Sequence, residues 1–355
     1  MRSAKNQNSK LRQKQGPKYQ SAFPAPKFQI KRSFQHPFIF VSKAIACSSE
    51  LNMFFIGGMM GKHFRVGVYN SQTLRPLKML PPHKDLLNVI RAIQFGRQFY
   101  LFVGSIDGEV SIWNISKGFI KIKSINLQNT VYSIEQIERF AIFGGFFKDF
   151  YCWDLSTMSF SRIIDTLGNY YFTSMKYVRK GDYFVVLCSK TGEILTFDWK
   201  SGQIIDKRVG HEPSYQVLGL DISASENVMV TGANDGTIKV WEVTKKGVKF
   251  SYEIDHRLAT EEWKPVVKCI YFLDDDGEQF VGAYADSLLT FWNRGICVPT
   301  AKTSAFEMGT GFVYDKPKNL LFCFDYKSGR GYVVAKAVFY PTSLMRYVQA
   351  KKSRH

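Results

Sequence analysis

The sequence lacks a hydrophobic run long enough to cross a membrane. The longest apolar runs, such as Met53–Met60, fall far short of the roughly 20 residues that a spanning helix needs. No hydrophobic segment near the first residue has the form of a secretory signal. We therefore expect no contact with membranes and no secretion.

Cysteine is sparse and unclustered. The chain has six cysteines, and no two of them form a C-x-x-C pair: Cys47, Cys152, Cys188, Cys269, Cys297 and Cys323. Most lie in or beside predicted strands, which is typical of small buried hydrophobes in a reducing compartment. Because a zinc site needs clustered ligands, we predict no metal and no cofactor.

Signatures of catalysis are also missing. Gly57–His63 has the wrong spacing for a phosphate loop and a histidine where Ser or Thr would bind the metal, so it predicts a hairpin turn. Gly309-Thr-Gly311 lacks the third glycine of a dinucleotide loop, and neither H-E-x-x-H nor G-x-S-x-G occurs. The acidic stretch Asp274–Glu278 predicts a solvated turn between two strands. We predict no catalytic residues and no enzymatic activity.

Acidic residues are absent from both ends of the chain. Residues 1–32 hold nine Lys/Arg and residues 336–355 hold five, with no Asp or Glu in either segment, whereas the whole chain has a net charge of +18. The excess of positive charge therefore belongs to the two tails. The residues that we predict to contact a nucleic acid or an acidic partner are Arg2, Lys5, Lys10, Arg12, Lys14, Lys18, Lys351, Lys352 and Arg354.

What the chain does have is one hairpin, repeated. The clearest copy, Val230–Glu242, places the turn Asn-Asp-Gly between two strands and ends the second strand near Trp241. The aromatic residues that close successive hairpins are 44, 40, 44, 44 and 51 positions apart: Tyr69, Trp113, Trp153, Phe197, Trp241 and Trp292. A weaker seventh hairpin lies at 320–335. This period predicts propeller blades of four strands each.

On these residues the chain resembles the WD-repeat β-propeller family. The fifth repeat matches the family's structural tetrad at His211, Thr231, Asp235 and Trp241. The resemblance implies that these four form a buried hydrogen-bonded chain with a structural role. Other repeats depart from the pattern, since repeat two has Val103 where a hydroxyl is expected. No particular subfamily is identified.

The resemblance also implies how the ring closes. We expect an all-β, seven-bladed propeller over residues 27–338, with the alternating segment Phe28–Phe34 as the outer strand of the last blade. Both ends of the chain then leave the ring at one place. Residues 1–26 form a basic tail that we expect to be disordered, and 339–355 form a second basic tail with a possible short helix.

These features predict a non-enzymatic scaffold that binds proteins in a multiprotein or ribonucleoprotein assembly, with tails that contact RNA or another acidic surface. The tails have two other interpretations, a localisation signal or simple solubilisation. A long connection before blade six offers Arg257 and Trp263 as candidate contacts with a protein partner. The alternative is an adaptor of a ubiquitin ligase, although Trp153-Asp-Leu-Ser156 has Ser where such adaptors often carry Arg. We expect the protein to be located in the nucleus, nucleolus or cytoplasm. Because the N-terminus is basic and free of acids, the mitochondrion is a further alternative.

Overall fold

The fold is described from a computed structural model of the 355-residue chain. The structure describes residues 29–147, 149–164, 171–188, 191–213, 215–254, 266–284, 289–293, 308–325 and 329–335. The predicted tails 1–26 and 339–355, including the possible short helix, lie outside these residues, so the division into tails and ring remains a prediction.

Antiparallel strands form the first three blades, each a sheet of four strands. Blade one is β2 (Phe40–Ser48), β3 (Met53–Met60), β4 (His63–Asn70) and β5 (Pro76–Met79). Blade two is β6 (Leu87–Phe95), β7 (Gln98–Ser105), β8 (Glu109–Asn114) and β9 (Ile120–Asn126). Blade three is β10 (Val131–Ile137), β11 (Phe140–Gly145), β12 (Phe150–Asp154) and β13 (Ser159–Ile164).

The same plan continues to the end of the chain. Blade four is β14 (Phe172–Val178), a 3₁₀ turn at Arg179–Gly181, β15 (Tyr183–Cys188), β16 (Glu193–Phe197) and β17 (Ile204–Val209). Blade five is β18 (Val217–Ile222), β19 (Val228–Ala233), β20 (Ile238–Thr244) and β21 (Gly247–Ile254). Blade six has three strands among the described residues, β22 (Val267–Phe272), β23 (Gln279–Tyr284) and β24 (Leu289–Asn293). Blade seven is β25 (Met308–Asp315), β26 (Leu320–Asp325), β27 (Arg330–Ala335) and β1 (Gln29–Gln35).

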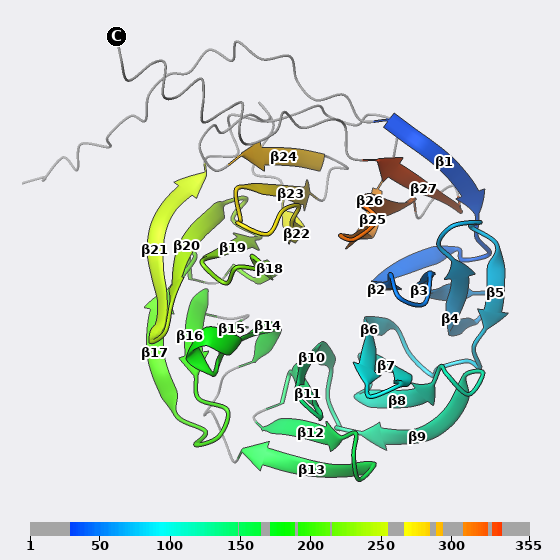
Figure 1. The fold of residues 1–355 in the computed structure, drawn as a ribbon, viewed down its shortest axis with the longest axis horizontal. Helices are drawn as coiled ribbons and strands as arrows, with labels where there is room; N and C mark the ends of the chain where they lie inside the picture. Colours follow the sequence, from blue (N-terminus) through cyan, green and yellow to red (C-terminus); the bar gives the residue numbers. More distant parts are fainter. Residues whose placement is uncertain are drawn as a thin grey trace, which may run out of the picture.

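Within the described residues these strands form seven sheets, arranged in a ring with the first strand of each blade on the inside (Figure 1). The predicted all-β, seven-bladed propeller is confirmed. In each of the seven blades, the inner strand pairs with its neighbour through a register shift near the start of the inner strand. Such bulges increase the local twist, and strong twist suits blades that run from the inside of a ring to its rim.

Hydrophobic side chains gather between blades. One buried cluster joins each pair of neighbours, and seven clusters complete the circle within the described chain. The cluster between blades three and four stacks Phe150 on Phe172 and Phe197, with ring centroids 5.1 and 5.0 Å apart. Each blade therefore buries its two faces against its neighbours, and the fold holds together only as a ring.

The first strand closes this ring. β1 pairs antiparallel with β27, so blade seven has the order β1-β27-β26-β25, as the sequence predicts. Gln29 lies opposite Ala335, which places the start of the first strand beside the end of the last (Figure 1). The polypeptide thus enters and leaves the ring at one point.

Phe34 is the side chain that secures the closing strand. It lies across from Gly331 in the register, and a Cβ added at Gly331 would come within 2.3 Å of the phenyl ring. The ring of Phe34 also contacts Phe54 at 5.4 Å, Tyr69 at 5.7 Å and Phe324 at 6.1 Å between centroids. A single residue of β1 therefore joins blades seven and one.

We predict that Phe34→Ala lowers the free energy of unfolding by about 2–3 kcal/mol, because it removes a half-buried ring and three aromatic contacts. Urea unfolding of the whole chain measures the change. Phe250→Ala is the matched control, since Phe250 also lies on an outer strand but is 48% exposed, and it should cost about 1 kcal/mol or less. Equal losses for the two variants would contradict the assigned role of Phe34.

Candidate functional site: buried polar hairpins and the central channel

Blade five carries a buried chain of polar side chains. His211 precedes β18, Thr231 lies on β19, Asp235 lies in the turn, and Trp241 lies on β20. The Nε2 atom of His211 lies 2.7 Å from the hydroxyl of Thr231, which also accepts a 3.0 Å hydrogen bond from the indole N–H of Trp241. The Nδ1 atom of His211 lies 3.3 Å from Asp235. At most 3% of any of these residues is exposed.

Asp235 also shapes the turn itself. It accepts hydrogen bonds from the backbone N–H of Thr237 at 2.8 Å and from its hydroxyl at 2.7 Å, and Gly236 supplies the positive φ that this turn requires. Burial acts to raise the pKa of Asp235, but hydrogen bonds from His211 and Thr237 outweigh burial and hold the pKa well below its usual value. The polar groups satisfy one another, so the geometry is that of a structural lock between the hairpin and the preceding connection.

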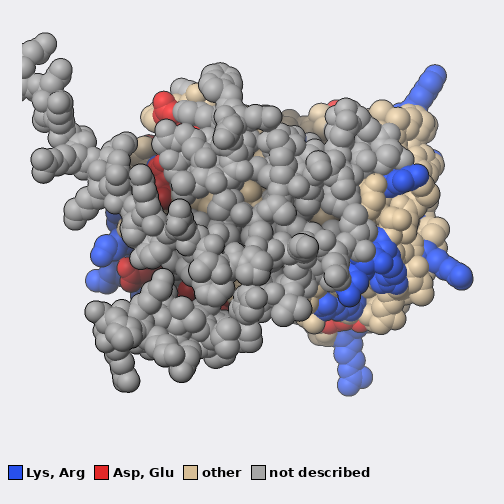
Figure 2. Space-filling view, turned by 90° about the horizontal axis from the view of Figure 1, so that it is seen from above, with Lys and Arg blue, Asp and Glu red and all other residues tan. Residues whose placement is uncertain are grey.

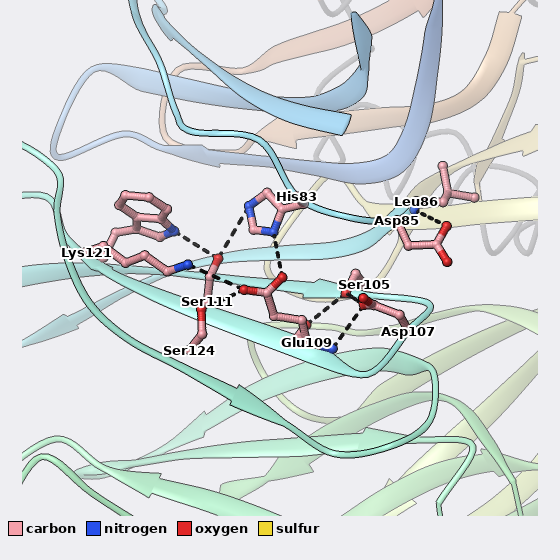
Figure 3. Close-up of polar contacts among 10 residues, drawn as sticks. His83, Asp85, Leu86, Ser105, Asp107, Glu109, Ser111, Lys121 and Ser124 are labelled. Carbon is pink, nitrogen blue, oxygen red and sulfur yellow. Dashed lines mark hydrogen bonds and ion pairs between the residues drawn. The ribbon is translucent and has the colours of Figure 1, made fainter. Parts of the chain in front are cut away.

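Blade two contains a related network that sequence reasoning missed. His83 is buried between blades one and two, where its backbone N–H donates to Phe64 at 2.8 Å. Its Nε2 atom lies 3.5 Å from the hydroxyl of Ser111, and that hydroxyl accepts a 2.9 Å hydrogen bond from the indole of Trp113 (Figure 3). Val103 does occupy the strand position of Thr231, as the sequence indicates, but Ser111 on the paired strand supplies the hydroxyl.

The hydroxyl that accepts from the tryptophan comes from different strands in blades five and two. In blade five Thr231 stands opposite Lys239, whereas in blade two Val103 stands opposite Ser111. Blade six has the same exchange, since Thr290 stands opposite Gly282 and accepts a 2.7 Å hydrogen bond from the indole of Trp292. Paired positions face the same side of a sheet, so either strand delivers the hydroxyl to the tryptophan. The sequence signal is a Ser or Thr two residues before the Trp.

Blade three shows what happens without that hydroxyl. The residue two before Trp153 is Tyr151, and the residue opposite Tyr151 is Phe143. The indole N–H of Trp153 is buried and has no hydrogen-bond partner among the described residues. The ring packs instead between blades two and three, under the ammonium group of Lys123 at 5.8 Å.

A charged cluster surrounds the histidine of blade two. Glu109 lies 3.7 Å from Nδ1 of His83 and 3.4 Å from Lys121, and it accepts a 2.6 Å hydrogen bond from Ser124 (Figure 3). Burial acts to raise the pKa of Glu109, but Ser124, His83 and Lys121 together lower it. Burial lowers the pKa of His83, although Glu109 opposes that shift. The imidazole is therefore neutral at physiological pH.

The inner strands surround a cavity of about 360 Å³ at the centre of the ring. Ion pairs cross from blade to blade along its wall. Arg91 on β6 lies 2.8 Å from Glu135 on β10, and Lys176 on β14 lies 4.0 Å from Glu135 and 3.6 Å from Asp221 on β18. The carboxylate of Asp221 also accepts a 2.8 Å hydrogen bond from the backbone N–H of Phe272. The channel charges thus join neighbouring blades.

Burial shifts the pKa of several groups along this channel. It raises the pKa of Asp221, which Lys176 partly opposes, and it lowers the pKa of Lys268. It also raises the pKa of Cys47 to about 12, so this thiol stays protonated and unreactive. Within the part of the chain that the structure describes, no group of three His, Cys, Asp or Glu residues is placed to hold a metal ion.

The remaining predicted contacts lie beyond the described residues. This applies to Arg2, Lys5, Lys10, Arg12, Lys14, Lys18, Lys351, Lys352 and Arg354, predicted to lie in the tails, and to Arg257 and Trp263, the predicted contacts with a protein partner. The acidic stretch at 274–278 forms the predicted turn between β22 and β23, where Asp274 accepts hydrogen bonds from the backbone N–H groups of Gly277 and Glu278 at 2.9 and 3.0 Å. The segment 57–63 lies in the β3–β4 hairpin, as predicted.

Among the described residues, no helix is long and apolar enough to span a bilayer.

We predict that Ser111→Ala lowers the free energy of unfolding by about 1–3 kcal/mol, because it leaves the buried indole N–H of Trp113 without an acceptor. Adding Val103→Thr to Ser111→Ala should recover most of the loss, since residue 103 faces the same side of the sheet. Urea unfolding of the wild type and of these two variants measures both effects. If Val103→Thr restores no stability, a hydroxyl at residue 103 cannot replace that of Ser111, and the equivalence of the two strand positions is contradicted.

We predict that His83 makes the fold sensitive to mild acid. Because burial lowers its pKa in the folded state, the unfolded chain takes up the proton first, at a pKa near 6.5. Stability should therefore fall as pH drops below about 6.5, until the folded state also binds the proton. His83→Gln should flatten the stability profile in this window, and identical pH slopes for wild type and variant would exclude the effect.

Comparison with known proteins agrees with this architecture. The family described as WD domain, G-beta repeat, matches residues 202–242, which contain all four members of the blade-five network. The β-propeller domain of Cps50 (Swd1) from Myceliophteria thermophila superposes with a TM-score of 0.72 at 14% identity, covering 88% of this chain and 100% of that domain. This structural likeness concerns the fold.

The curated relatives are much longer proteins. Periodic tryptophan protein 2 of Arabidopsis thaliana is 26% identical over 145 residues, which is 41% of this chain and 14% of that protein. Its counterpart in Saccharomyces cerevisiae is 36% identical over 64 residues, or 18% of this chain and 7% of that protein. The match thus spans a small part of these relatives. The chain is thus a seven-bladed β-propeller whose residues 202–242, from the fourth blade into the fifth, match the WD domain, G-beta repeat.

Proposed function

We propose that this protein is a non-enzymatic scaffold in a multiprotein or ribonucleoprotein assembly. Its ring binds protein subunits, and its basic tails contact RNA or another acidic surface. The observation that carries the proposal is the pairing of Gln29 with Ala335 at the closing strand. Residues 1–32 and 336–355 carry fourteen Lys/Arg and no acid, and both segments start from this one point of the ring.

Convergence matters because it raises the local density of positive charge. Two basic segments that start side by side act on the same stretch of a polyanion, and each phosphate that they neutralise releases counterions. The contacts we assign to the tails are Arg2, Lys5, Lys10, Arg12, Lys14, Lys18, Lys351, Lys352 and Arg354. A localisation signal in the same segments would be compatible with this role.

The polar groups of the ring support a binding role over a catalytic one. His211 and Asp235 are held in the blade-five network, and the channel acids Glu135 and Asp221 pair with cations of neighbouring blades. A general base needs a free, positioned group with a nucleophile or substrate beside it. These groups are instead engaged in holding the ring together.

The partners we propose are protein subunits, bound in part through the loop that contains Arg257 and Trp263, with RNA at the tails. Nucleus, nucleolus and cytoplasm are the compartments that fit such an assembly. The ubiquitin-ligase adaptor gains no support from blade three. There Ser156 donates its hydroxyl to Asp154 at 2.6 Å and closes the local turn.

We predict salt-sensitive binding of single-stranded RNA by the whole chain. Neutralising the six N-terminal cations Arg2, Lys5, Lys10, Arg12, Lys14 and Lys18 to Gln should reduce the slope of log affinity against log salt by about 0.7 for each phosphate that is no longer neutralised. Fluorescence anisotropy with labelled oligouridine, between roughly 50 and 200 mM KCl, measures the slope.

The matched control neutralises six exposed cations of the ring, Lys62, Lys84, Arg97, Lys245, Lys246 and Lys249. Its slope should stay near that of the wild type. If RNA binding does not depend on salt, or if the chain binds no RNA, the tails do not contact RNA. The proposal of a protein-binding scaffold would then remain. Affinity purification with and without ribonuclease then tests the scaffold, which is abandoned if no protein subunits copurify under either condition.

A further inference from the structure

Three successive outer strands of the ring carry positive charge without acidic residues. β1, β5 and β9 are the outer strands of blades seven, one and two. Together with their flanking turns they cover residues 29–39, 71–79 and 115–126, which contain no Asp or Glu. We call the seven cations of these segments the basic rim: Lys31, Arg32, Arg75, Lys78, Lys117, Lys121 and Lys123.

The basic rim is exposed and largely without ion pairs. All seven residues are exposed, and among the described residues the single acid paired with any of them is Glu109, 3.4 Å from Lys121. Lys78 donates to the backbone carbonyl of Gly118 at 2.8 Å. Lys121 and Lys123 lie over the indole rings of Trp113 and Trp153, at 5.5 and 5.8 Å. Apart from the pair with Glu109, these ammonium groups thus contact a carbonyl oxygen and aromatic rings rather than acids.

The outer strands of blades four and five, by contrast, carry acids as well as cations. On β17, Arg208 lies 2.7 Å from Asp206, and Lys207 lies 2.7 Å from Glu193. On β21, Glu253 lies 3.4 Å from Lys239. Lysine on a free strand edge protects against aggregation, but that protection needs neither seven cations nor the exclusion of acids from the turns. Protection of edges alone therefore does not account for the basic rim.

The basic rim is continuous with the N-terminal tail. Lys31 and Arg32 belong both to β1 and to the acid-free segment 1–32. Arg32 donates to the backbone carbonyl of Gln72, in the turn before β5, and Lys78 of β5 reaches the turn before β9. Figure 2 shows Lys and Arg side chains projecting on the side of the molecule where β1 and β5 lie in Figure 1, with little acidic surface beside them. The positive charge thus runs from the tail around the ring.

We propose that the basic rim binds the sugar–phosphate backbone of single-stranded RNA and extends the contact made by the tail across blades seven, one and two. An extended polyanion fits this pattern better than a compact acidic protein patch, because the cations follow three separate strand edges around the circumference. Few exposed aromatic residues accompany them, so recognition rests on phosphates rather than on base stacking. This inference rests on the proposed function.

The test neutralises the basic rim in the whole chain. The rim variant changes Arg75, Lys117, Lys121 and Lys123 to Gln, and its matched control changes Lys200, Lys245, Lys246 and Lys249, which are exposed on blades four and five. Anisotropy with labelled oligouridine should show a salt slope about 3 lower for the rim variant, since each phosphate that it fails to neutralise accounts for about 0.7. The control should match the wild type. A charge-preserving variant, with Lys at position 75 and Arg at the other three, should keep the wild-type slope, and circular dichroism checks that every variant is folded.

Three results would overturn the inference. If the salt slope is unchanged for the rim variant but reduced for the tail variant, the basic rim does not contact RNA. The proposed function then stands without it. If the wild-type chain binds no RNA, neither the basic rim nor the tails contact RNA. A rim variant that keeps RNA binding but no longer binds labelled polyglutamate would assign the surface to an acidic protein partner.

Discussion

The pairing of β1 with β27 is the contact on which the rest of this structure depends. Every blade buries its faces only against its two neighbours, so an open arc of blades leaves two hydrophobic faces and a sheet edge in water. The strand at Gln29–Gln35 supplies the missing edge of blade seven, and Phe34 fills the space above Gly331 against rings of blade one. The same pairing fixes where the chain enters and leaves. Closure therefore links the stability of the ring to the placement of its charged ends.

The polar interior shows how a degenerate repeat preserves a structural role. The tryptophans of blades two, five and six all donate to a hydroxyl, but this hydroxyl comes from the second strand in blade five and from the third strand in blades two and six. The fold requires a hydrogen-bond acceptor for the indole N–H at one place on the face of the sheet. Either of two residues that pair across the second and third strands can provide it. Blade three omits the acceptor and still packs its tryptophan. The repeats have thus diverged in residue identity more than in geometry.

Charge is distributed unevenly around this closed ring. The channel acids and bases pair across blades, and the outer strands of blades four and five take part in ion pairs with residues of their own blades. The basic rim differs because Asp and Glu are absent from its strands and turns. Since it adjoins the segment that enters at β1, the basic rim and the N-terminal tail share one sign of charge. The proposed scaffold would then present an RNA contact on one side and leave the rest of its surface to protein partners.

The amino-acid sequence by itself determined the repeat, the blade count and the closing strand. These follow from local signals, namely turn residues such as Asn234-Asp-Gly236, alternation in Phe28–Phe34 and the regular spacing of aromatic residues. It also singled out the four members of the blade-five network, because they match a known pattern position by position. Only the tertiary structure revealed that Ser111 and Thr290 replace the hydroxyl of Thr231, since cross-strand register brings together residues that no linear pattern aligns. The basic rim likewise depends on tertiary structure, because its cations lie far apart in the sequence and form one surface only when the ring places β1, β5 and β9 one after another around its edge.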